Sequence, residues 1–211
     1  MESYPQNDIV RPEATDWQYG RGSFDIASKS VKNFVALAQY TGKAWQMPDK
    51  ALGNLQLNAE GGEPGKGENS DAIRRWVAPL DGKVKITGEL QHMKKNGDGI
   101  IARVVLNGTT LLGEWTALNQ GASTLAENIV VKKGETLDFI VSGGKDPNSD
   151  TFQWAPTVTM TTAEMPGMPG MPRIWDAKTD FMDIRQMPKP LGPWEELAQV
   201  LLLSNEFMWV D

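Results

Sequence analysis

The sequence predicts an all-β protein: an antiparallel β-sandwich or jelly roll, followed by a linker and one short C-terminal α-helix. Three observations support this. Residues 70–161 contain about six short apolar segments separated by turn signals, which is typical of sandwiches. No segment between them has helical periodicity. The chain also holds 21 Gly and 13 Pro in 211 residues, a composition that favours turns over long helices.

The clearest strand lies around residues 83–90. Val84, Ile86 and Leu90 alternate with polar residues, the period-2 pattern of a strand with one buried face. Further along, Asn107-Gly108 is a hairpin signal between two apolar runs. Earlier in the chain, residues 34–37 and 55–57 are expected to be strands, and the Gly-rich stretch 60–71 is expected to be a loop.

The composition changes after residue 161, so we divide the chain into four parts. Residues 1–15 form a polar arm and residues 16–161 the sandwich. The repeated Met, Pro and Gly of residues 162–173 predict a linker. Residues 174–211 form a tail, in which Pro193 and the two acidic residues after it predict a helix over about 193–207.

Charge and composition exclude several classes of function. The formal net charge is -6, so nucleic acid is not an expected partner. The chain has no Cys, which excludes disulfides and cysteine-ligated metals, and no cofactor is expected. The longest apolar run, at residues 200–203, is far too short to insert across a membrane. The first eleven residues lack the apolar region of a signal peptide.

An ordered series of short motifs spans most of the chain. It comprises Gly61-Gly62-Glu63-Pro64-Gly65, Ile73-Arg74-Arg75-Trp76, Ala78-Pro79, Asp81-Gly82, Gly97-Asp98-Gly99, residues 134–139, Asp150-Thr151-Phe152, Trp154-Ala155-Pro156 and the closing residues 193–207. In this series the chain resembles the C-terminal β-sandwich region of large planctomycete proteins of unknown function. Those proteins begin with a cytochrome c-like domain and continue through helical domains of unknown function.

The resemblance covers roughly residues 16–211. It implies a galactose-binding-like or carbohydrate-binding-module-like sandwich and a secreted, periplasmic or cell-surface setting. Two departures matter. Glu63 stands where the family pattern has His, and the haem-binding Cys-x-x-Cys-His motif is missing, so no redox function carries over.

Aromatic residues are the first candidates for ligand binding, because the chain has eight Trp and sugar rings stack on aromatic faces. Trp76 and Trp154 lie within strand patterns and are expected in the core. Trp45 lies among Gly, Lys and Pro and is the better candidate for an exposed platform, together with Tyr19.

Arg74, Arg75 and Asp98 complete the candidate ligand-binding set. Consecutive strand residues point to opposite faces, so the two arginines diverge. One interpretation is a clamp on a carboxylate or sugar acid. The other is a structural ion pair with a carboxylate such as Asp71, Asp138 or Asp150.

Asp146, Asn148 and Asp150 place oxygen ligands at alternate positions, which is how a calcium loop begins. The EF-hand pattern fails further on, so the alternatives are a looser Ca²⁺ site or a turn rich in Asp and Asn. His92, the one histidine, has no nucleophile motif or second ligand and is expected at the surface or hydrogen-bonded. No catalytic residue is assigned, and the chain is not expected to be an enzyme.

Two functions remain open. The first is a non-catalytic, carbohydrate-binding-like module of a larger secreted or periplasmic protein. The alternative is a structural or assembly domain. Its apolar C-terminal helix would pack on upstream domains of a parent protein or form a homodimer.

Overall fold

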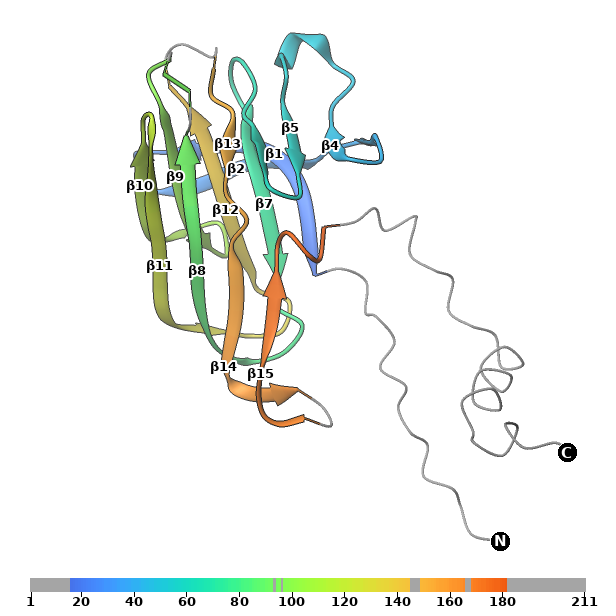
Figure 1. Ribbon diagram of the computed structural model, residues 1–211, viewed down its shortest axis with the longest axis vertical. Helices are drawn as coiled ribbons and strands as arrows, with labels where there is room; N and C mark the ends of the chain where they lie inside the picture. The colour runs from blue at the N-terminus through green and yellow to red at the C-terminus, as the bar shows by residue number, and fades with distance from the viewer. Residues whose placement is uncertain (1–15, 93, 96, 145–148, 166–167, 182–211) are drawn as a thin grey trace, which may run out of the picture. The chain divides into compact units, whose positions relative to one another are not determined.

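The computed structural model describes residues 16–92, 94–95, 97–144, 149–165 and 168–181. They form an all-β unit of two antiparallel sheets (Figure 1), as the sequence predicts. A 3₁₀ turn, η1 (Lys50–Leu52), is the one helical element among them. The predicted C-terminal helix at 193–207 and the N-terminal arm lie outside the described residues.

Sheet A is six-stranded. In spatial order it contains β10 (Thr110–Ala117), β9 (Ile100–Leu106), β12 (Thr136–Gly143), β7 (Asp71–Val77), β1 (Trp17–Asp25) and β2 (Ser30–Ala36). Sheet B is nine-stranded. It contains β15 (Met168–Asp176), β14 (Thr157–Met165), β8 (Gly82–His92), β13 (Phe152–Gln153), β6 (Gly61–Glu63), β5 (Gln56–Asn58), β4 (Ala44–Gln46) and β3 (Gln39–Tyr40), with β11 (Gln120–Val131) on the other edge of β8.

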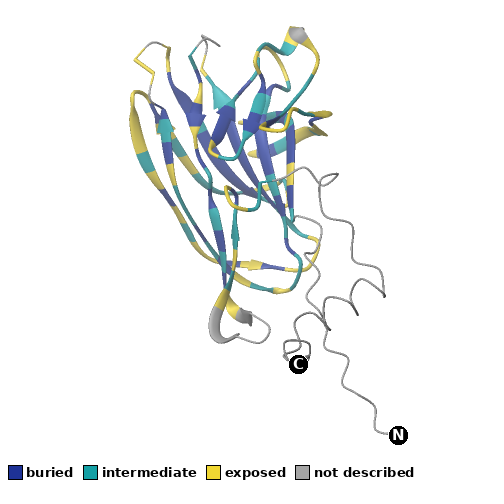
Figure 2. Ribbon diagram, turned by 45° about the vertical axis from the view of Figure 1, so that its right-hand side comes forward, coloured by how far each residue is buried: buried dark blue, intermediate teal, exposed yellow. Residues whose placement is uncertain are grey.

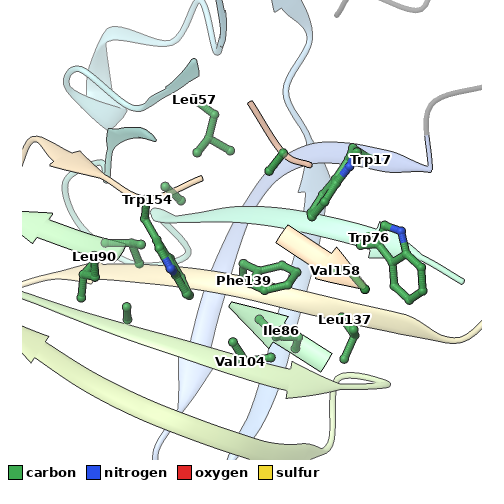
Figure 3. Close-up of a cluster of buried hydrophobic side chains, with 14 of the residues drawn as sticks. Trp17, Leu57, Trp76, Ile86, Leu90, Val104, Leu137, Phe139, Trp154 and Val158 are labelled. Carbon is green, nitrogen blue, oxygen red and sulfur yellow. The ribbon is translucent and has the colours of Figure 1, made fainter. Parts of the chain in front are cut away.

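The main core lies between the two sheets, where the strands bury the side chains of their inner faces (Figure 2). In β8 the buried positions include Val84, Ile86 and Leu90, as the alternation predicts. Trp76 and Trp154 are 0% and 2% exposed, so both are core residues as expected. Figure 3 shows them around Phe139, whose ring centroid lies 5.6 Å from that of Trp154.

Sheet A is curled, and a second, smaller core fills the inside of the curl. The backbone N–H of Val31 in β2 donates to the carbonyl of Gly108, 2.8 Å away in the turn between β9 and β10. The strands at the two ends of the sheet therefore meet. Ile73, Val105 and Ile140 are fully buried there, beneath residues that include Phe24 and Phe34.

The turn at Asn107-Gly108 confirms the predicted hairpin. Both residues have positive φ, 51° and 67°, as the two central residues of a type I′ turn require. The side chain of Asn107 accepts a hydrogen bond from the backbone N–H of Thr136 at 2.9 Å. This turn therefore also joins β9 to the start of β12.

Two predictions about the chain's organisation are wrong. The described residues of the 162–173 segment do not form a linker, because they belong to β14 and β15 and the compact unit continues to Phe181. Pro172 fits a strand here because β15 is an edge strand, whose outward N–H groups need no partner. Gly61 and Gly62, expected in a loop, form β6. A side chain at either position would collide with the backbone of β13 or β5.

Candidate functional site

Four aromatic side chains from distant parts of the chain meet where β1 approaches β3 and β4. They are Tyr19 of β1, Tyr40 of β3, Trp45 of β4 and Phe181, which follows β15; we call them the aromatic cluster. Tyr40 and Trp45 are directly opposite partners in the β3–β4 pair and so share one face. Tyr19 is buried at 6% exposure, whereas the other three rings are half-buried.

The rings of the cluster contact one another in a chain. Tyr19 stacks on Trp45 with centroids 6.1 Å apart and planes 14° apart. Tyr40 is tilted by 43° against Trp45, at 5.2 Å. Phe181 closes the group, edge-on to Tyr19 at 4.8 Å and 6.0 Å from Tyr40. Such ring–ring contacts stabilise the arrangement beyond what the burial of apolar area contributes.

Arg74 lies beneath the aromatic cluster, on the face of β7 that points to sheet B. It is 2% exposed, and its guanidinium donates to the carbonyl oxygens of Ala177 at 2.7 Å and Asn58 at 2.8 Å. Its Cζ lies 5.6 Å from the centroid of Tyr19 and 6.0 Å from that of Phe181. Burial lowers the pKa of Arg74 to about 10, so the group remains charged at neutral pH.

Of the two interpretations that the sequence left open for Arg74, these contacts favour a structural role over a ligand clamp. Its donors already tie β7 to the segments that carry Asn58 and Ala177, and its buried guanidinium gives an outside carboxylate no access. Arg74 therefore supports the cluster from within. Sequence reasoning missed this because the partners of Arg74 are backbone carbonyls, 16 and 103 residues away along the chain.

Tyr19 has an unusual environment for a phenol. Burial raises its pKa, although the charge of Arg74 acts in the opposite direction, so the hydroxyl stays protonated. That hydroxyl is buried and has no hydrogen-bond partner among the described residues. Because buried polar groups are nearly always paired, a buried water molecule is the natural partner.

A tight turn positions Phe181. The carboxylate of Asp176 accepts hydrogen bonds from the backbone N–H groups of Lys178 and Thr179 at 3.0 and 2.9 Å. Asp180 in turn accepts from the N–H of Asp176 at 2.9 Å. Burial raises the pKa of Asp180, and the hydrogen bonds that it accepts only partly offset this effect. The turn, fastened by Arg74 at Ala177, leaves Phe181 little freedom.

Arg75 points the other way, into the curl of sheet A. Its guanidinium forms a two-pronged ion pair with the buried Asp138, at 2.5 and 3.0 Å, and lies 3.8 Å from the ring centroid of Phe34. This is the structural pair that the sequence offered as the alternative to a ligand clamp. The two arginine side chains point to opposite faces of β7, as predicted, and each guanidinium is hydrogen-bonded to other residues of the fold.

The other predicted residues lie away from the aromatic cluster. Asp98 is exposed in the β8–β9 loop, and its carboxylate lies against Gly144. Asp150 is buried and packs against Gly143. Asp146 and Asn148 lie outside the described residues. Within the described ranges no three His, Asp or Glu side chains are grouped to hold a metal ion, and calcium binding stays a prediction.

His92 is buried and hydrogen-bonded at both ring nitrogens. Its Nδ1 accepts from the backbone N–H of Asn119 at 3.2 Å, so its Nε2 is the donor to the carbonyl of Ser149 at 2.8 Å. Of the two expected positions, at the surface or hydrogen-bonded, the second is the one observed. His92 holds two loops together at one end of the sandwich.

Two members of the cluster were not predicted, Tyr40 and Phe181. The signal for Tyr40 was present, because Thr41, Gly42 and Lys43 form a turn signal that places Tyr40 opposite Trp45. Phe181 gave no such signal, since its position depends on β15, which was taken for part of a linker and tail.

No helix among the described residues is long and apolar enough to cross a bilayer. Comparison with protein-family models found no match, and comparison with curated proteins found none either.

Two of the solved structures that resemble the chain are a CBM6 module and a PA14 domain. One is the C-terminal CBM6 of LamC, a marine laminarinase from Zobellia galactanivorans, at 17% identity and a TM-score of 0.28, covering 42% of this chain and 72% of that one. The other is the PA14 domain of the antifreeze protein MpAFP, at 12% identity and a TM-score of 0.31, covering 82% and 93%. At these low scores neither likeness bears on function.

Proposed function

We propose that this chain is a non-catalytic, carbohydrate-binding-like module of a larger secreted or periplasmic protein, and that the aromatic cluster is its binding platform. The observation that carries the proposal is the half-buried ring of Trp45, which is held parallel to the buried ring of Tyr19. A rigid aromatic surface of this kind offers a π face to the CH groups of a sugar without losing side-chain freedom on binding.

The polar groups around the platform support the same function. Arg74 sits behind the rings with its donors taken up by two carbonyls, so it fixes their positions and leaves recognition to ring stacking. A neutral, hydroxyl-rich ligand fits this arrangement better than an anionic one.

The proposal of a non-catalytic role rests on the sequence, which contains no nucleophile motif and one His. The secreted or periplasmic setting rests on the resemblance to the planctomycete proteins.

A glycan array tests the proposal. The wild-type chain should bind at least one class of neutral glycan, and Trp45→Ala should lose that binding while melting cooperatively. Leu125→Ala is the matched control, because Leu125 is an apolar residue 52% exposed on β11, outside the aromatic cluster. A wild-type chain that binds no glycan, or a Trp45→Ala chain that binds as well as wild type, would refute the proposal.

A further inference from the structure

The aromatic cluster can present three rings to a ligand, namely the half-buried rings of Tyr40, Trp45 and Phe181. Tyr19 is buried and nearly parallel to Trp45, so it backs that ring from inside the fold. The shape of the ligand that can use the site therefore depends on how the three outer rings are inclined to one another.

Those outer rings do not share a plane. Tyr40 makes an angle of 43° with Trp45 and 52° with Phe181, and the centroids are 5.2 and 6.0 Å apart. Two rings inclined this steeply cannot both lie flat on one planar surface. A ligand that contacts more than one of them must bend or turn between them.

The fold holds these inclinations in place. Thr41 closes the β3–β4 turn, with its N–H donating to the carbonyl of Ala44 at 2.9 Å and its hydroxyl accepting from the N–H of Ala44 at 3.1 Å. Tyr40 and Trp45 flank this turn directly. Phe181 is held by the turn at 176–180, which Arg74 fastens through Ala177. These hydrogen bonds fix the backbone that carries the three rings, and the contacts between the rings fix their inclinations.

We infer that the site takes a single, soluble polysaccharide chain or the end of one, and not the flat face of a crystalline polysaccharide. This inference rests on the proposed function. A flat face can stack on one ring of the cluster at a time, and one ring contributes only roughly twofold to tenfold in affinity. A single chain changes direction between successive sugar units, so it can contact two or three inclined rings at once.

The experiment compares two physical forms of ligand. Soluble gluco-, xylo-, manno- and galacto-configured polysaccharides are tested by affinity electrophoresis, and crystalline cellulose and crystalline chitin by depletion from solution. We expect at least one soluble polysaccharide to retard the wild-type chain and neither crystalline polysaccharide to deplete it. Tyr40→Ala should weaken the soluble interaction roughly twofold to tenfold, and Leu125→Ala should leave it unchanged. Phe181→Ala gives a second reading if Tyr40→Ala does not fold.

The outcomes separate the inference from the proposed function. Depletion by either crystalline polysaccharide would overturn the inference while leaving carbohydrate binding in place. Soluble binding that neither Tyr40→Ala nor Phe181→Ala weakens would overturn the inference as well, because the inclined rings would not be the site. A chain that binds neither form would contradict the proposed function and the inference with it.

Discussion

Arg74→Met should destabilise the fold and loosen the aromatic cluster at the same time. The substitution removes two hydrogen bonds from a charged donor, to the carbonyls of Ala177 and Asn58, each worth about 1.5–3 kcal/mol. It also removes the guanidinium from the rings of Tyr19 and Phe181, a contact worth about 0.5–2 kcal/mol. Relief of the cost of burying the charge offsets part of this sum.

We therefore expect a net loss of about 2–4 kcal/mol, which for a domain of this size lowers the melting temperature by roughly 10 °C. Urea denaturation followed by tryptophan fluorescence measures the free energy of unfolding directly. Arg74→Lys keeps the charge but cannot reach both carbonyls, so it should recover less than half of the loss. An Arg74→Met chain within about 0.5 kcal/mol of wild type, the range of neutral surface substitutions, would show that the guanidinium does not tie these segments together.

Three further predictions concern the rest of the fold. Asp138→Ala should lower the free energy of unfolding by about 2–4 kcal/mol, because it leaves the charge of Arg75 without its partner. In urea denaturation the double variant Arg75→Met/Asp138→Leu should be close to wild type. Equal losses of stability in the single and the double variant would contradict this prediction. Burial raises the pKa of Asp71 above its ordinary value of 3.8, so its contribution to stability grows as the pH falls from neutral and is lost as the pH rises through the raised pKa. The melting temperature of Asp71→Asn should therefore depend less steeply on pH than that of the wild type. An unchanged slope of melting temperature against pH would contradict this prediction. Gly108→Ala should lower stability by about 1 kcal/mol, since φ there is 67°; a stability gain would exclude that conformation.

Local sequence patterns were enough to predict the sandwich. The alternation in β8 reflects one face against the core and one against water, and this holds whatever the partner strands are. The Asn107-Gly108 signal worked for a similar reason, because positive φ at both positions is a property of the turn itself. Such features depend on neighbours in the sequence, so they can be read from it.

The errors arose where long-range contacts decide the structure. Residues 162–173 look like a linker by composition, and only their position at a sheet edge allows Pro172 to sit in a strand. For Arg74 the sequence suggested a ligand clamp or a carboxylate partner, and it could not reveal the backbone carbonyls that bind it because they are remote in sequence. Trp45 was identified as a candidate, but the exposed platform expected there proved half-buried, since Tyr19 and Tyr40 pack against it.

The central claim is that the aromatic cluster binds carbohydrate, and the indole N–H resonances of the protein test it most directly. The chain has eight Trp, and among the described ones Trp45 belongs to the cluster while Trp76 and Trp154 lie in the core. Titration with a soluble polysaccharide that the chain binds should shift the Trp45 resonance in a saturable manner and leave those of Trp76 and Trp154 in place. Saturable shifts confined to other indoles, with Trp45 unmoved, would contradict the claim.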